Sequence, residues 1–188
     1  KPIIMIAGHM DEVGAMVTAI TDRGFIKMIP IGGLNPEVML SQNVLVNVGK
    51  ERFVPGVVGA VPPHITKGEE HKSLSFDDLL LDVGADSKDH AQELGLEIGQ
   101  QITFMNQYYF SADGKKIVSK AWDNRFGCGM ALEVLRELQT MDHPNTVIAG
   151  GTVQEEVGLR GATTASQMVE PDLFIAIDVS PIGDFLSK

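Results

Sequence analysis

The stretch "TVIAGGTVQEEVGLRGATTASQMVEPDLFIAIDVSP", residues 146–181, carries the pattern that decides the fold. Its two apolar runs, at 146–154 and 172–177, are continuous rather than alternating, which is typical of strands buried on both faces of a parallel sheet. The segment between them, 161–170, predicts a short helix that Pro171 stops. The order strand, helix, strand indicates an α/β unit built on a parallel sheet.

Three further segments extend this pattern. "PIIMIAG", 2–8, is another continuous apolar run, and "KIVSKA", 116–121, predicts a strand just before a helix. That helix, "RFGCGMALEVLRELQ" at 125–139, has apolar residues at helical spacing, namely Cys128, Ala131, Leu132, Leu135 and Leu138. Residues 115–178 therefore alternate strands and helices, as α/β proteins do.

The middle of the chain, residues 14–106, follows a different pattern. Short apolar stretches are separated by Gly and Pro, and they predict two strands around a turn at 22–24 and further strands at 43–48, 52–61, 79–84 and 96–104. One helix is predicted from an Asp86/Ser87 cap to Gly95, and a polar loop is predicted over 62–75. We interpret residues 14–106 as a small β-rich domain inserted after the first parallel strand.

Composition excludes several classes of partner. The 188 residues carry a formal net charge of −10 without a basic cluster, which argues against binding to nucleic acid or to an anionic membrane surface. No apolar run approaches the roughly 18 residues expected of a membrane span. Cys128 is the single cysteine, so the chain can form no internal disulfide, which suits a reducing compartment. We therefore expect a cytoplasmic protein.

Acidic residues and one histidine follow the predicted strands at the point where each strand ends. His9 and Asp11 follow the first run, Glu155 and Glu156 the second, and Asp178 the third. Open parallel sheets bind ligands at this edge. An imidazole with several carboxylates is a ligand set for divalent metals such as Zn, Co or Mn, and a carboxylate-rich set suits two ions about 3.5–4 Å apart.

Several of these residues also have a structural explanation. Asp123, which opens the Cys128 helix, could be a helix cap, and Glu155 and Glu156 could form a solvated turn. Adjacent residues of a strand point to opposite faces, so a regular strand would aim only one glutamate at the site. The "VGLRG" that follows indicates that the strand ends there and that the chain can turn. The coincidence of these acids at strand ends favours the metal site.

Four motifs together resemble the M42 family of di-metal aminopeptidases. They are "AGHMDEVG" at 7–14, "KAWDNRFG" at 120–127, "VQEEVGLRGA" at 153–162 and "AIDVSP" at 176–181. The resemblance covers the whole chain and implies an α/β fold, with a mixed, largely parallel sheet flanked by helices. It makes residues 1–13 and 107–188 two parts of a catalytic domain, the second one truncated, and makes 14–106 an inserted β-rich dimerisation domain.

The resemblance also implies a ligand set for two divalent metal ions per subunit, Zn or Co or else Mn. Asp123 would bridge the two metals, Glu156 would bind one of them, and His9 and Asp178 would bind the other. The family pattern needs one more histidine on a strand near the C-terminus, and the sequence offers no match. We therefore expect an interior piece of a longer protein, with that ligand beyond Lys188, and expect the piece to be inactive alone.

Two further residues receive catalytic roles from the resemblance. Glu155 would be the general base, and Asp11 would hydrogen-bond to His9 and fix the orientation of its ring. A cis peptide bond is expected between Asp123 and Asn124. The implied activity is hydrolysis of the N-terminal residue from short peptides, by an enzyme whose dimers assemble into a tetrahedral dodecamer.

Two alternatives stay open at this point. A glycoside hydrolase could use Glu155 and Glu156 as its carboxyl pair, at a separation of about 5–9.5 Å, but this leaves His9, Asp123 and Asp178 unexplained. A non-catalytic assembly module could use the same residues as structural metal ligands. The preferred N-terminal residue (glutamyl, leucyl or broad), the native metal and the oligomeric state are also open.

Overall fold

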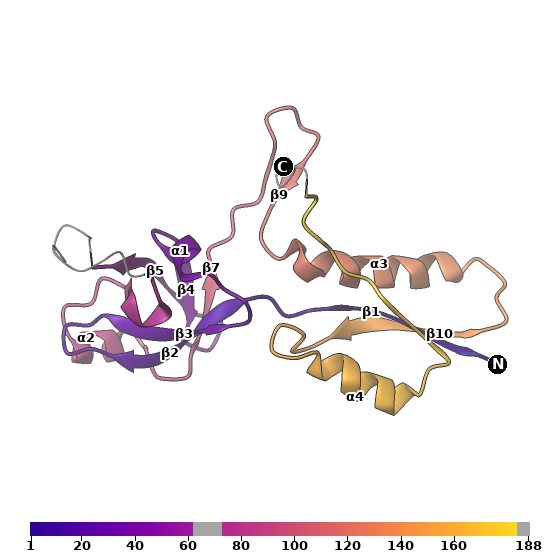
Figure 1. The fold of residues 1–188 in the computed structure, drawn as a ribbon, viewed down its shortest axis with the longest axis horizontal. Helices are drawn as coiled ribbons and strands as arrows, with labels where there is room; N and C mark the ends of the chain where they lie inside the picture. The colour runs from indigo at the N-terminus through magenta and orange to yellow at the C-terminus, as the bar shows by residue number, and fades with distance from the viewer. Residues whose placement is uncertain (62–72, 184–188) are drawn as a thin grey trace. The chain divides into compact units, whose positions relative to one another are not determined.

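A computed structural model of the chain describes residues 1–61 and 73–183 (Figure 1). Most of the polar loop predicted over 62–75 lies outside the described residues. The chain divides into two compact units, of which the first comprises Lys1–Glu12 with Gln107–Lys188 and the second Val13–Asn106. Among the described helices, none is both long enough and apolar enough to cross a membrane.

The first unit contains a three-stranded parallel sheet. Strand β1 (Ile3–His9) lies in the centre, between β10 (Thr146–Thr152) and β11 (Leu173–Ala176). Both pairings are parallel, and the first runs from Ile3 opposite Thr146 to His9 opposite Thr152. The three continuous apolar runs of the sequence are therefore neighbours in one parallel sheet, as predicted.

Two helices accompany this sheet, α3 (Trp122–Leu138) and α4 (Arg160–Val169). Strands β1 and β10 run between them in the view of Figure 1. Helix α3 packs against β1 and β10. Ala131 lies on the buried face of α3. Leu132 is 62% exposed because it lies beside that face, although its spacing in the sequence suggested that it belongs to it.

The strand predicted over 116–121 does not join the parallel sheet. Only Ile117–Val118 is extended, as β9, and it pairs antiparallel with β8 (Tyr109–Phe110). The predicted strand is therefore present in part, but its expected place in the parallel sheet was wrong, because two apolar residues among polar neighbours are too few for a strand buried on both faces. Asp113 and Gly114 form the turn between β8 and β9, with Gly114 at φ 70°.

The second unit is a closed antiparallel barrel of six strands. In order around the barrel they are β2 (Gly14–Ile20), β3 (Ile26–Ile31), β6 (Leu79–Asp82), β5 (Phe53–Ala60), β4 (Asn43–Asn47) and β7 (Gln101–Phe104). Alternate residues point inward and form a core that includes Val17, Ile26, Val44, Val46 and Leu81. All six strands coincide with stretches that the sequence predicts to be extended.

Three short helical segments accompany the barrel strands: α1 (Pro36–Met39), the 3₁₀ helix η1 (Phe76–Asp78) and α2 (Lys88–Glu93). Helix α2 begins as predicted, since the Ser87 hydroxyl accepts a hydrogen bond from the His90 backbone N–H at 3.1 Å. It ends before Gly95, whose φ of 98° favours glycine. The sequence interpretation missed α1 and η1, because each is no more than about one turn long.

Candidate metal centre

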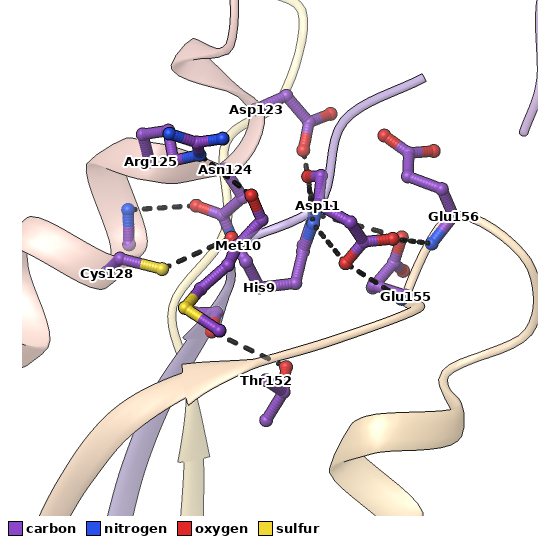
Figure 2. Close-up of polar contacts among 12 residues, drawn as sticks. His9, Met10, Asp11, Asp123, Asn124, Arg125, Cys128, Thr152, Glu155 and Glu156 are labelled. Carbon is purple, nitrogen blue, oxygen red and sulfur yellow. Dashed lines mark hydrogen bonds and ion pairs between the residues drawn. The ribbon is translucent and has the colours of Figure 1, made fainter. Parts of the chain in front are cut away.

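The predicted site residues converge at one edge of the parallel sheet of the first unit. Figure 2 shows all of them except Asp178, which also lies beside His9. Strand β1 ends at His9, and β10 and β11 end two or three residues before Glu155 and Asp178. Because all three strands are parallel, their carboxyl ends meet at this edge. The fold therefore brings together side chains that are up to 169 positions apart in the sequence.

His9 is the centre of this cluster. It is 3% exposed, and its Nε2 lies 2.9 Å from Asp123 Oδ1, 3.8 Å from Glu155 Oε2 and 4.0 Å from Asp178 Oδ1. Burial alone would lower the pKa of His9. The hydrogen bond to Asp11 and the negative charges of Glu155, Asp123 and Asp11 outweigh burial and raise this pKa.

The donor atoms fall into two overlapping groups that could each hold a metal ion. One consists of His9, Glu155 and Asp178, and the other of His9, Asp123 and Glu156, with all ligand atoms of a group within 4.8 Å of one another. The pKa of Glu156 is raised, first by burial and then by the negative charges of Asp123 and Glu155. A divalent cation would relieve this repulsion, so imidazole and carboxylate donors in this arrangement fit such an ion.

Asp123 reaches the site because α3 starts irregularly. The peptide bond between Asp123 and Asn124 is cis, as the resemblance implies, and both residues have non-helical φ and ψ. Ala121, in the left-handed region at φ 57°, turns the chain just before them. The Asp123 carboxyl contacts His9, which favours the ligand interpretation over the helix cap.

The two adjacent glutamates lie on a turn. Strand β10 ends at Thr152, and Gln154 adopts a left-handed conformation with φ 57°. The Glu155 carbonyl then accepts hydrogen bonds from the backbone N–H groups of Gly158 and Leu159, at 2.9 and 3.0 Å. The expected end of the strand is therefore present, and it allows both carboxyl groups to reach one site.

Asp11 does more than the sequence suggests. Its backbone carbonyl, 3.0 Å from His9 Nδ1, makes the hydrogen bond to the ring, whereas its carboxylate is 3.6 Å from that nitrogen. The carboxylate instead accepts hydrogen bonds from the backbone N–H groups of Glu155, at 3.1 Å, and Glu156, at 3.2 Å (Figure 2). Asp11 thus links the end of β1 to the turn that carries Glu155 and Glu156, called the glutamate turn below.

This contact gives a first prediction. In the whole protein, Asp11→Ala should lower kcat/KM by about 10–100-fold, because the glutamate turn loses both of its acceptors. Asp11→Asn should be milder, since its amide oxygen can still accept one of the two hydrogen bonds. Kinetics and metal content would be measured for both variants. Equal losses in the two variants would contradict a role through the backbone N–H groups.

Three further residues around β1 were not identified as site residues from the sequence. The Arg125 Nε donates to the Met10 carbonyl at 2.7 Å, and the Cys128 thiol donates to the His9 carbonyl at 3.2 Å. Both contacts hold the backbone at the end of β1. Asn124 is also buried beside the site. Arg125 and Asn124 lie within the "KAWDNRFG" motif, which is the signal that could have identified them.

Comparisons with known proteins show which family the chain resembles. The family profile described as M42 glutamyl aminopeptidase matches residues 1–188. A glutamyl aminopeptidase of Lactococcus lactis subsp. cremoris (strain MG1363) is 42% identical over 185 residues, which cover 97% of this chain and 52% of that protein. The chain therefore spans about half the length of this relative.

Two solved structures of similar proteins extend the comparison. A TET aminopeptidase from the marine sediment archaeon Thaumarchaeota archaeon SCGC AB-539-E09 matches with a TM-score of 0.93 at 37% identity, over 98% of this chain and 52% of that one. The Pyrococcus horikoshii TET1 peptidase, which can assemble into a tetrahedron or a large octahedral shell, matches with a TM-score of 0.83 at 33% identity, over 98% and 56%. Both likenesses extend over the two units of this chain.

Proposed function

Because this chain belongs to the M42 family of glutamyl aminopeptidases, we propose that the whole protein is a metal-dependent aminopeptidase that removes N-terminal residues from short peptides. The observation that carries the proposal is the cluster of carboxylates around the buried imidazole of His9. A peptidase site uses all of these groups, whereas a glycosidase needs only two carboxyls.

In this proposal, four side chains hold two divalent metals: His9, Asp123, Glu156 and Asp178. Asp123 would be the ligand that the two ions share, and its carboxyl group lies at hydrogen-bonding distance from His9. When bound, Zn, Co or Mn would acidify a water and polarise the scissile carbonyl. Further ligands can come from parts of the protein outside this chain.

Glu155 is the general base of the proposed mechanism. Its side chain is half-buried, and its carboxylate lies 3.8 Å from His9 Nε2, beside the ligand set. It accepts a proton from the attacking water and returns it to the leaving amine of the product. Asp11 keeps this carboxylate in place through the backbone N–H of Glu155.

The proposed assembly is a homo-oligomer in which dimers build a larger closed particle. It is supported by the likeness to the TET1 peptidase and by the presence of the β-rich unit at Val13–Asn106, where the family resemblance implies dimerisation. Such an assembly would limit access to short or unfolded peptides. A cytoplasmic location is part of the same proposal.

The proposal is tested by assaying the whole protein on aminoacyl-p-nitroanilides. We expect turnover of substrates with a free α-amino group and none of their N-acetylated counterparts. Removal of metal with EDTA should reduce the rate by about tenfold or more, and Zn or Co should restore it. Undiminished activity after complete removal of metal would contradict the proposal, as would cellulose hydrolysis that resists the chelator.

A further inference from the structure

The buried side chain of Asn124 connects the start of helix α3 to the segment that directly follows strand β11. Asn124 is 1% exposed. Its Nδ2 donates to the Ile177 carbonyl at 2.7 Å, and its Oδ1 accepts from the Gly127 backbone N–H at 2.9 Å. A buried amide with a partner on each side has one favourable orientation, because rotating it would leave both groups unsatisfied.

The two ends of this connection adjoin two proposed metal ligands. Asn124 follows Asp123 directly, and Ile177 directly precedes Asp178. The Ile177 peptide is also held on its other side, since its backbone N–H donates to the Ala7 carbonyl of β1 at 2.9 Å. The Asn124 amide therefore completes a continuous connection from β1 through β11 to the start of α3.

Gly127 shows how little room this connection has. A Cβ at Gly127 would lie 2.5 Å from Asn124 Oδ1 and 2.5 Å from the Ile177 carbonyl oxygen. Both distances are far below van der Waals contact, so no side chain fits between helix α3 and the end of β11. The Asn124 amide, the Gly127 N–H and the Ile177 carbonyl are packed directly against one another. This packing fixes the distance between the start of α3 and the end of β11.

We propose that Asn124 is a positioning residue that sets the separation of the Asp123 and Asp178 carboxyl groups. The inference rests on the proposed function, because it takes these two carboxylates as metal ligands. Asn124 touches neither substrate nor metal in this account. It acts through the backbone on both sides of the site, so changing it should weaken the binding of metal rather than remove a ligand.

The test uses the whole protein with Asn124→Asp and Asn124→Ser, and Co²⁺ as the probe. Asn124→Asp keeps the acceptor for Gly127 but puts a carboxylate oxygen against the Ile177 carbonyl. Asn124→Ser shortens the side chain and leaves one contact unmade. Metal-free protein is titrated with Co²⁺ while its visible absorption is followed, which reports both affinity and coordination geometry. We expect at least one Co²⁺ to bind about tenfold or more weakly, with an altered spectrum.

Ala131→Gly is the matched control. Ala131 is buried on the same helix, two turns further on, and glycine there is a much poorer helix former than alanine. This variant should lower the unfolding midpoint yet bind Co²⁺ with the wild-type affinity and spectrum. Wild-type Co²⁺ binding by either Asn124 variant would overturn the inference. Absence of Co²⁺ binding by the wild-type protein would instead overturn the proposed function, so the two failures are distinguishable.

Discussion

Replacing Glu155 with glutamine is expected to lower kcat by about 10²–10⁴-fold in the whole protein, with metal content unchanged. Glutamine has nearly the same size and can keep the contacts of the turn, because these involve the backbone of Glu155 rather than its carboxyl group. It cannot accept a proton, so the attacking water loses its base. The measurement is steady-state kinetics on an aminoacyl-p-nitroanilide, together with metal analysis of the same samples.

A matching substitution of the neighbouring Glu156 tests which of the two glutamates is the metal ligand and which is the base. One group of candidate ligands contains Glu155 with His9 and Asp178, and the other contains Glu156 with His9 and Asp123. Geometry therefore allows either glutamate to be a ligand. If Glu156 is the ligand and Glu155 the base, Glu156→Gln should lower metal content as well as activity, whereas Glu155→Gln should lower activity alone.

Glu137→Gln is the control for both substitutions, since this exposed glutamate lies on α3 and pairs with Arg136. It should leave kcat and metal content unchanged. Loss of metal from Glu155→Gln would assign Glu155 as a ligand and contradict its role as base. Substantial turnover by a fully metal-loaded Glu155→Gln variant would contradict that role equally.

The sequence predicted the parallel sheet well because its signal is strong and local. A continuous apolar run such as "PIIMIAG" favours a strand buried on both faces, and β1 is indeed the central, largely buried strand of its sheet, whereas β10 and β11 beside it are more exposed. Once three such strands are parallel, their carboxyl ends must meet. His9, Glu155 and Asp178 were therefore predictable as neighbours from their positions after the strands alone.

Other features depend on backbone geometry that no residue pattern encodes. The contact of His9 with the Asp11 carbonyl, rather than with the carboxylate, follows from how the chain bends after β1. The "KAWDNRFG" motif could have marked Asn124 as a site residue but not the burial of its amide, since asparagine is mostly an exposed residue. Each is a contact between a side chain and the backbone, and the sequence specifies only the side chain.

The substitution Gly8→Ala is expected to destabilise the first unit by about 3 kcal/mol, which corresponds to roughly 6–12 °C in its unfolding midpoint. A Cβ at Gly8 would lie 2.5 Å from the Gly127 carbonyl carbon and 2.6 Å from the Cys128 backbone nitrogen. Both atoms belong to the main chain of α3, so no side chain can turn away to make room. Relief would require the helix to move off β1, and Asp123 would move with it away from His9.

Gly150→Ala separates this effect from the general consequence of replacing a strand glycine. Gly150 lies on the adjacent strand β10, and a Cβ there would meet nothing within 4 Å. It should be neutral, or stabilising by about 0.4–1 kcal/mol, because alanine restricts the unfolded chain. Thermal unfolding and metal titration of the whole protein, carried out on both variants, distinguish a clash with α3 from the general effect of replacing a strand glycine. A Gly8→Ala variant with wild-type stability and metal affinity would show that the contact between β1 and α3 does not set the geometry of the site.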